Sequence, residues 1–331
     1  YFQALGANLG DACFCYVEGA DDSDFTVNLV SQYISGKDLK AGKFLTQMSK
    51  RYFRLRIIDG VCFVGTSGGS ARSFDSCVVG NRIYVVSNHR VSIFSADDFS
   101  YITYFGSNGQ GNGQFSSPNS ICSDGTYLYV ADTNNNRIQK FSLAGEYVGK
   151  AGKEDCTAGS GNGEFNQPIC IRHYNGNLYI SDLNNNRVQV HQASSLSYVS
   201  TTPIGMRSVG CWVDETNQYL IASSWNSIKV FRLSDNGLVR QSGTLAVGRC
   251  PVLIGNYLFR GDYDNHKIMK YNYSDFSIIG EYYHGSGSLP GQLSNPNHLC
   301  FWPERNLILV SNYGSPYYVV GITPELKFQS N

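Results

Sequence analysis

The chain has 331 residues, of which 42% are hydrophobic and 16% charged, so it is not a disordered polypeptide. Its 26 basic residues balance 26 acidic ones, and a net charge of zero argues against a protein whose main role is to bind nucleic acid. No run of about 20 apolar residues is present, which excludes a transmembrane helix from the sequence. The 35 glycines, 23 tyrosines and 18 phenylalanines favour short strands joined by tight turns.

The N-terminal segment differs from the rest of the chain. Apolar residues at helical spacing over 25–36 predict a short helix that ends at Gly36. We therefore expect an N-terminal extension over 1–51, partly helical and packed on a larger domain over 52–331.

The larger domain is built from repeats. The two clearest copies, 127–141 and 177–191, each contain an apolar strand, an Asp, an Asn-rich turn, an Arg and a second, alternating strand. Weaker copies cover 82–94, 219–231, 257–271 and 307–319. The turn residues that anchor the six copies are Asn88, Asp132, Asp182, Ser224, Asp262 and Asn312.

Each repeat can be divided into four short strands. In the second repeat these are 120–123, 127–131, 137–141 and 146–149. Alternation of apolar and polar residues suits half-buried strands, and Asn and Asp tolerate the backbone of a tight reversal. Four strands in each of six units predict an all-β, six-bladed β-propeller.

The links between repeats carry a second motif, Gly-x-Gly-x-Phe-x-x-Pro, which occurs at 111–118 and 161–168. Together with the strand and the Asp-x-x-Asn-Asn-Arg turn that follow it, this motif resembles the NHL repeat. The resemblance is strong over 106–191, moderate in blades five and six, and weak in blades one and four. It implies an NHL-like six-bladed β-propeller over about 60–331, but it implies no particular activity.

A propeller must join its first blade to its last. The segment 61–65 has the pattern of a fourth strand with no second strand before it. We expect it to be the outer strand of the last blade, a closure that hides both edges. The alternative is that 326–328 takes this place.

Cysteines occur in two groups. One cysteine recurs in the first strand of each blade: Cys77, Cys122, Cys170, Cys211, Cys250 and Cys300. A small apolar side chain suits the place where inner strands crowd, and disulfides at these positions are the alternative. The other four are candidates for disulfides: Cys13, Cys15, Cys62 and Cys156.

The cellular setting is inferred from the cysteines and one sequon. Asn272-Tyr-Ser274 is an N-glycosylation acceptor in an exported protein. The expected setting is extracellular or in the secretory lumen, with the cytoplasm as the alternative. The cysteine spacing does not favour zinc, so no metal and no cofactor are expected.

No catalytic residue is assigned. Some NHL propellers are amidating lyases with a three-histidine metal site, but here only His173 and His298 lie near first strands. Asp132, Asp182 and Asp262 recur at one turn position, as do Arg137 and Arg187, which indicates turn hydrogen bonds and a contact between blades rather than chemistry. A lyase or hydrolase with a site in the central tunnel is the alternative function, and an RNA-binding NHL domain is a second alternative.

Residues that break the repeat are the better guide to function. Where other turns are Asn-rich, one face of the ring carries aromatic and basic side chains, residue types that anchor interfaces. These candidate binding residues are His89, Arg90, Trp225, Tyr263, His266, Lys267 and Tyr313. We expect a non-catalytic scaffold whose loop face meets a protein, peptide or glycan. Homo-assembly, as part of an extracellular structure, is a further expectation.

Overall fold

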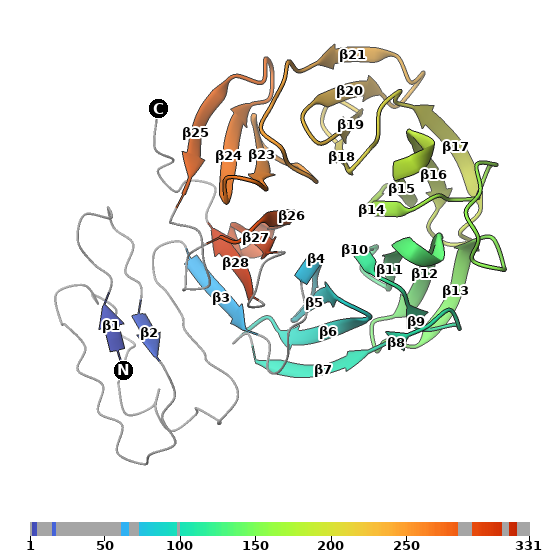
Figure 1. Ribbon diagram of the computed structural model, residues 1–331, viewed down its shortest axis with the longest axis horizontal. Helices are drawn as coiled ribbons and strands as arrows, with labels where there is room; N and C mark the ends of the chain where they lie inside the picture. Colours follow the sequence, from blue (N-terminus) through green and yellow to red (C-terminus); the bar gives the residue numbers. More distant parts are fainter. Residues whose placement is uncertain are drawn as a thin grey trace.

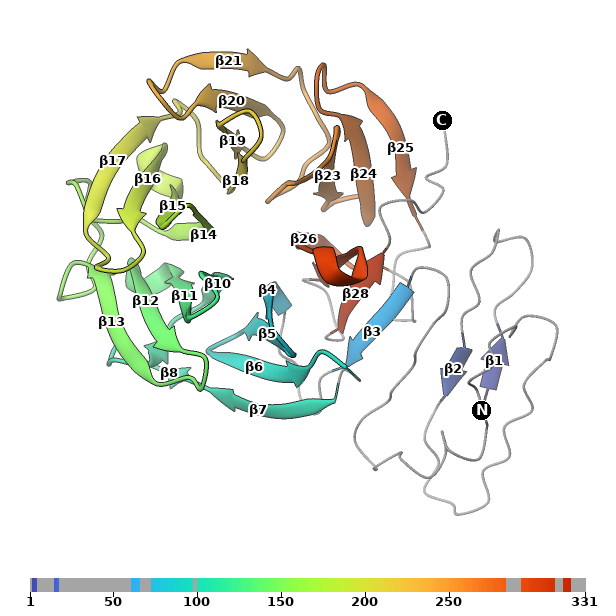
Figure 2. The same ribbon diagram turned by 180° about the vertical axis from the view of Figure 1, so that it is seen from behind.

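The computed structural model describes residues 2–4, 15–17, 61–65, 73–97, 100–283, 293–312 and 318–322. Its strands form a ring of small antiparallel sheets, seen from the two faces in Figures 1 and 2. The described residues contain no α-helix. The expectation of an all-β propeller is therefore confirmed. The helix predicted over 25–36 lies outside the described residues.

Five four-stranded sheets consist of strands that are consecutive in the chain. Sheet one comprises β4 (Ser73–Val79), β5 (Arg82–Ser87), β6 (Arg90–Ser95) and β7 (Tyr101–Phe105). Sheet two comprises β10 (Pro118–Ser123), β11 (Tyr127–Asp132), β12 (Arg137–Ser142) and β13 (Tyr147–Gly152). Sheet three comprises β14 (Pro168–Tyr174), β15 (Asn177–Asp182), β16 (Arg187–Gln192) and β17 (Tyr198–Pro203). Sheet four comprises β18 (Gly210–Asp214), β19 (Tyr219–Ser223), β20 (Ile228–Arg232) and β21 (Leu238–Gln241). Sheet five comprises β22 (Val252–Ile254), β23 (Tyr257–Asp262), β24 (Lys267–Asn272) and β25 (Ile278–Tyr282).

A further four-stranded sheet, sheet six, joins segments from both ends of the described chain. It contains β26 (Pro296–Trp302), β27 (Leu307–Asn312), β28 (Tyr318–Ile322) and β3 (Val61–Gly65), in that order. Strand β3 runs antiparallel to β28, with Val61 opposite Ile322 and Gly65 opposite Tyr318. The predicted closure by 61–65 is confirmed, and it covers an edge that would otherwise be open to pairing with another chain.

Two short pairs and three turns complete the described elements. Strands β1 (Phe2–Ala4) and β2 (Cys15–Val17) pair antiparallel, and β8 (Ser107–Asn108) and β9 (Gln114–Phe115) pair parallel. Single 3₁₀ turns follow the second strand of sheets two and three and the first strand of sheet six: η1 (Thr133–Asn135), η2 (Leu183–Asn185) and η3 (Pro303–Arg305). Each ends on an asparagine with a left-handed backbone: Asn136, Asn186 and Asn306, with φ of 50°, 56° and 51°. Asparagine is among the few residues besides glycine that adopt this conformation readily.

In sheets two and three, the recurring Asp and Arg join the sheet to the link that precedes it. Arg137 Nε lies 2.8 Å from Asp132 Oδ2, and both side chains are fully buried. The Arg137 guanidinium also donates to the carbonyls of Gln110, Gly111 and Gln114 in the link. Sheet three repeats the ion pair with Asp182 and Arg187 at 2.8 Å. The structural role predicted for these residues is confirmed.

The hydrophobic core lies between neighbouring sheets. Phe115, the phenylalanine of the link motif, is fully buried among apolar residues of sheets one and two, including Tyr84, Leu128 and Phe141. Phe165 of the next link is equally buried, between sheets two and three. The phenylalanine of the link motif therefore packs between two successive sheets and holds them together.

Candidate functional site

Two regions of the ring bring together side chains that the repeat alone does not require. One is the face formed by the turns between second and third strands. The other is the axis of the ring, around which the first strands of the sheets lie (Figure 1).

On the loop face, one arginine lies between two aromatic rings. The Arg249 guanidinium carbon lies 4.9 Å from the ring centre of Trp225 and 6.0 Å from that of Tyr263. Trp225 belongs to the turn after β19 and Tyr263 to the turn after β23, while Arg249 comes from the link between sheets four and five. All three side chains are partly exposed. We call these three residues the aromatic–arginine stack.

Backbone hydrogen bonds hold the stack in place. The Gly248 amide donates to the Trp225 carbonyl at 2.8 Å, and the Tyr263 amide donates to the Val247 carbonyl at 2.7 Å. The link thus joins the turn of sheet four to the turn of sheet five, so the aromatic rings are positioned before any ligand arrives.

Arg260 on β23 is a second support for the stack. Its buried guanidinium donates to carbonyls that include those of Ala246, Gly248 and Trp225, at 3.1, 2.6 and 2.7 Å. Burial lowers the pKa of Arg260 to about 10, so the side chain stays charged at neutral pH. Five carbonyl dipoles around one cation account for its tolerance in the interior.

The other predicted loop-face residues have partners within the chain or lie outside the described residues. His89 Nδ1 lies 3.2 Å from the carbonyl of Phe115, and His266 Nδ1 accepts from the Asn295 amide at 3.0 Å. Lys267 pairs with Glu281 at 2.7 Å, and Arg90 lies over the ring of Tyr104 at 4.9 Å. Tyr313 lies outside the described residues. The structure therefore brings Trp225 and Tyr263 together with Arg249, which sequence reasoning missed.

The axis is filled by polar and sulfur-bearing side chains from all six four-stranded sheets or the links before them. We call this group the axial cluster: Asp75, Ser120, Cys170, Arg172, Cys211, Cys250 and His298. Asp75, Ser120 and Cys170 occupy one register position, because each lies opposite the penultimate residue of the second strand of its sheet.

Asp75 is the centre of the polar half of the axial cluster. Its Oδ2 accepts from Ser120 Oγ at 2.6 Å and from Arg172 Nη1 at 2.9 Å. His298 Nδ1 lies 3.3 Å from the same oxygen, but without the alignment of a hydrogen bond. Burial raises the pKa of Asp75, but the charges of Arg172 and His298 outweigh this effect, so its pKa lies below the ordinary value.

The sulfur half of the axial cluster contains three buried thiols. Cys170 Sγ lies 4.0 Å from Cys211 Sγ and accepts a hydrogen bond from the Cys211 amide at 3.5 Å. Cys250 Sγ lies 3.6 Å from His298 Nε2. Burial alone would raise the pKa of Cys170, but hydrogen bonds from Cys211 and Cys250 and the charge of Arg172 lower it.

The remaining inner-strand cysteines form a separate group. Burial raises the pKa of Cys77, and its neighbours Cys300 and Cys122 raise it further. All six cysteines predicted for inner strands are free thiols, although Cys250 lies in the link just before β22 and not in the strand itself. The interpretation of them as small packing residues is thus favoured over disulfides.

The disulfide predicted at Cys156 is wrong. Cys156 is a buried free thiol, and its sulfur lies 3.7 Å from Nη1 of Arg137, so it packs against the start of β12. Of the other three disulfide candidates, Cys13 lies outside the described residues, and Cys15 and Cys62 are described only as residues of β2 and β3.

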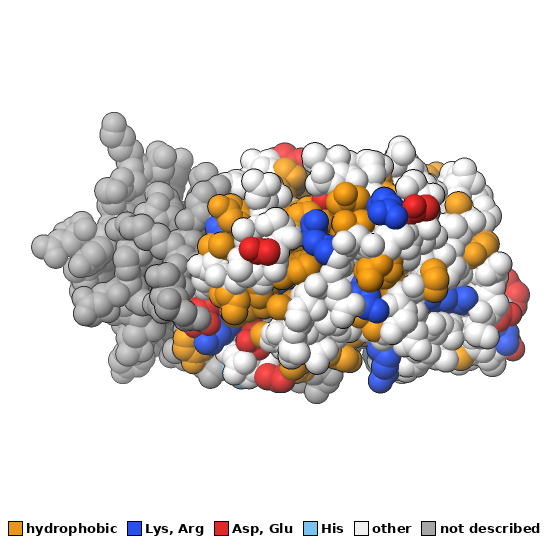
Figure 3. Space-filling model, turned by 90° about the horizontal axis from the view of Figure 1, so that it is seen from above, with side chains coloured by type: hydrophobic (Ala, Val, Ile, Leu, Met, Phe, Trp, Pro, Cys, Tyr) orange, Lys and Arg blue, Asp and Glu red, His pale blue; other side chains and the backbone are white. Residues whose placement is uncertain are grey.

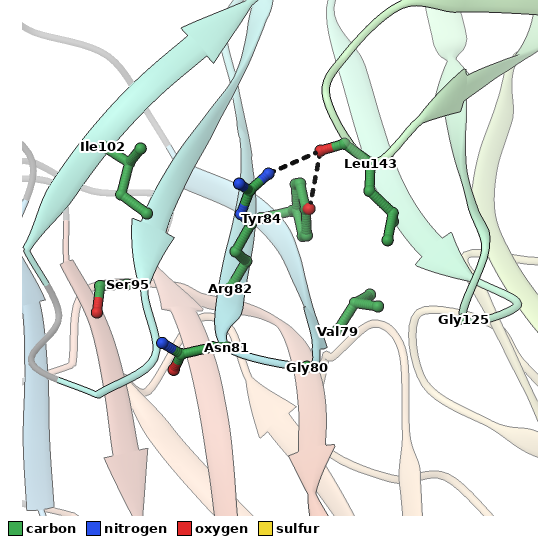
Figure 4. Close-up of a pocket in the computed structure, with 9 residues that line it drawn as sticks. All are labelled: Val79, Gly80, Asn81, Arg82, Tyr84, Ser95, Ile102, Gly125 and Leu143. Carbon is green, nitrogen blue, oxygen red and sulfur yellow. Dashed lines mark hydrogen bonds between the residues drawn. The ribbon is translucent and has the colours of Figure 1, made fainter.

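A hollow lies between sheets one and two, on the side of the β4–β5 turn. Its volume is about 670 Å³, and Figure 4 shows Arg82 and Tyr84 both directed at the carbonyl of Leu143, to which they donate at 3.3 and 2.9 Å. Because these hydrogen bonds are made within the chain, the hollow supplies few groups that would orient a ligand.

Two signals in the sequence mark the residues that were missed. Arg260 stands two residues before Asp262, where the clearest repeats have Val130 and Ile180. Arg172 lies opposite Tyr179 in sheet three, where Cys122 lies opposite Tyr129 in sheet two. A charged residue that replaces an apolar one in an otherwise regular repeat is the signal in both cases.

The fold defines the chain as a β-propeller, and one of its repeats is similar to the NHL repeat. The NHL repeat family matches residues 115–141, from the buried link phenylalanine to the end of the third-strand motif. Among solved structures, the chain is similar to the WD40 β-propeller domain of Doa1, with a TM-score of 0.54 and 13% identity. That similarity covers 76% of this chain and 82% of the other, and at this identity it shows the fold alone. No curated protein matches the chain.

Proposed function

We propose that this chain is a binding scaffold and that the aromatic–arginine stack of Trp225, Arg249 and Tyr263 contacts a protein or peptide partner. The observation that carries the proposal is the arginine held between two partly exposed aromatic rings at adjacent loop tips. Trp, Tyr and Arg are the residue types most enriched among those that dominate binding energy at interfaces.

Rigidity supports this proposal. The hydrogen bonds from Gly248 and Tyr263, together with the buried Arg260, hold the stack before binding. A surface that is already ordered loses little side-chain entropy when a partner binds, so more of the contact energy appears as affinity. The Asn-rich turns of sheets two and three lack comparable aromatic side chains.

A photo-crosslinking residue at Asn226 tests the proposal, because Asn226 is exposed beside Trp225. Asn256, exposed in the β22–β23 turn on the opposite face, is the matched position. We expect a defined protein adduct at 226, weakened by Tyr263→Ala, and none at 256. Equal labelling at both positions would contradict the proposal, and an adduct with a carbohydrate would change the class of partner to a glycan.

The outer rim is proposed to serve homo-assembly. The outermost strands of sheets one to five expose apolar side chains, among them Tyr104, Val148, Val199, Leu238 and Ile278. Figure 3 shows hydrophobic side chains interspersed with lysine and arginine on the rim near β21. Sedimentation of the purified chain at increasing concentration tests this, and a monomer throughout contradicts it.

The proposed extracellular or lumenal setting rests on the sequon at Asn272, since the seven cysteines of the described chain from Cys77 to Cys300 are free thiols. Asn272 lies at the end of β24, and its side-chain oxygen accepts from the exposed Ser274. Measuring the intact mass of the protein before and after glycosidase treatment tests this proposal. An unmodified Asn272 would contradict the extracellular or lumenal setting. No helix in the described part of the chain has the length and apolar character needed to span a membrane.

A further inference from the structure

We propose that Cys170, Cys250 and His298 bind a single zinc ion on the axis of the ring. Their sulfur and nitrogen atoms all lie within 4.8 Å of one another. The three side chains are fully buried. They come from sheet three, from the link before sheet five and from sheet six, so the folded ring alone brings them together.

The donor set fits this metal. Two thiolates and one imidazole form a known three-ligand zinc site, which leaves a fourth position for water or another donor. With zinc–sulfur and zinc–nitrogen bonds of about 2.3 and 2.0 Å at a tetrahedral angle, sulfur and nitrogen lie about 3.5 Å apart. Cys250 Sγ and His298 Nε2 lie 3.6 Å apart before any metal is considered.

Surrounding groups suit metal ligands. A zinc-bound histidine usually donates its other ring N–H to a carboxylate, which fixes the ring. His298 Nδ1 lies 3.3 Å from Asp75 Oδ2, and Asp75 is itself held by Ser120 and Arg172. Binding through Nε2 places the proton on Nδ1, which is buried and has no aligned partner in this structure, and a reorientation of the ring would let it donate to Asp75.

Charge balance also favours the ion. Zinc binding replaces one proton on each of Cys170 and Cys250, so two protons are released and the ion with its two thiolates is neutral. Asp75 and Arg172 already neutralise each other at 2.9 Å. The site with zinc therefore carries no net charge into the interior, where an unpaired charge is costly. The Cys211 amide, 3.5 Å from Cys170 Sγ, further stabilises a thiolate there.

The chain contains its own control. Cys77 and Cys122 are also buried inner-strand thiols, and the neighbouring Cys300 is partly exposed, but no histidine lies with these three in a ligand group among the described residues. Substituting Cys122 removes a buried thiol of the same kind from the same ring. Its effect on folding is thus comparable with that of Cys250→Ser, while the proposed ligands remain.

Metal analysis of the full chain without an affinity tag tests the proposal. Because the ligands are buried, the chain is unfolded under reducing conditions and refolded with zinc sulfate, then passed over a desalting column. We expect one zinc ion per chain, retained by Cys122→Ser and by a Cys13→Ser/Cys15→Ser variant. Cys250→Ser and His298→Gln should each lose most of the zinc.

Cobalt supplies a readout that does not depend on variants. Refolding the unmodified chain with Co²⁺ should produce thiolate-to-cobalt charge-transfer absorption with an intensity that corresponds to two Co–S bonds, together with tetrahedral visible bands. Absence of both zinc and this absorption would overturn the proposal. So would zinc that Cys250→Ser retains, because the metal would then be bound elsewhere. If the chain purified from cells grown with added copper contained copper(I) and no zinc, the assignment of the metal as zinc would be wrong.

Discussion

Arg172 and Asp75 are 97 residues apart in sequence, yet Nη1 of the arginine lies 2.9 Å from Oδ2 of the aspartate. The contact passes across sheet two, whose Ser120 bonds to both groups, and joins sheet three directly to sheet one. Asp75 is fully buried and the Arg172 side chain is 11% exposed. The axis of the ring is therefore held by a charge pair and not by apolar packing alone.

Removing the arginine should destabilise the ring strongly. Arg172→Met leaves the Asp75 carboxylate buried without its main partner, which typically costs about 3–5 kcal/mol. The free energy of unfolding in urea measures this loss. Arg232→Met is the control, because its pair with Asp235 is half exposed and solvent screening leaves such pairs little effect on stability. Equal effects of the two substitutions would contradict a structural role for the axial pair.

The same pair should make stability depend on acid pH. The pKa of Asp75 in the folded chain lies below its ordinary value of 3.8, so the unfolded chain binds the proton more readily. Its contribution is fully present above pH 3.8 and is lost as the pH falls through the folded-state pKa. Asp75→Asn should flatten the fall in unfolding free energy below that pH. An unchanged slope would assign the acid sensitivity to other carboxyl groups.

Lysine should not replace Arg137, the arginine that joins sheet two to the link before it, without a loss of stability. Arg137 binds Asp132 and three link carbonyls through a planar fork, which an ammonium group does not reproduce. Each buried carbonyl left without a donor costs about 1–3 kcal/mol, so we expect Arg137→Lys to lower the unfolding free energy by roughly that amount or more.

Arg187 in sheet three is the comparison for that substitution. It makes the same ion pair at 2.8 Å, but its side chain is 11% exposed, so water can replace part of what is lost. Arg187→Lys should therefore cost less than Arg137→Lys in the same urea titration. A larger loss of unfolding free energy for Arg187→Lys would show that burial does not determine how much these arginines stabilise the ring.

Closure of the ring depends on one short strand. Deleting residues 1–66 removes β3 and leaves β28 as an open edge, which invites pairing between chains. We expect faster amide exchange over 318–322 and aggregation that increases with concentration. Exchange over 137–142, inside sheet two, is the internal reference. Unchanged protection at 318–322 would contradict the role of β3.

Local sequence determined the strands and the turns. Period-two alternation in 137–141 and 187–191, the Asn-rich reversals and the link phenylalanines act over a few residues, and each copy confirms the others. The closing strand was also predictable, because 61–65 has strand character and no partner beside it in sequence. The predicted disulfide at Cys156 failed because spacing along the chain says nothing about which thiol faces which.

The contacts at the axis were decided only in three dimensions. The repeat shows that Asp75, Arg172 and His298 depart from their neighbours in the pattern, but 126 residues separate His298 from Arg172 (298 − 172). Which of these side chains come into contact depends on how the sheets are arranged around a common axis. The same arrangement places Arg249 against the rings of Trp225 and Tyr263. In sheets one to five, the hydrogen bonds between strands join segments that are consecutive in the chain, whereas charges and thiols at the centre meet only after every sheet has taken its place.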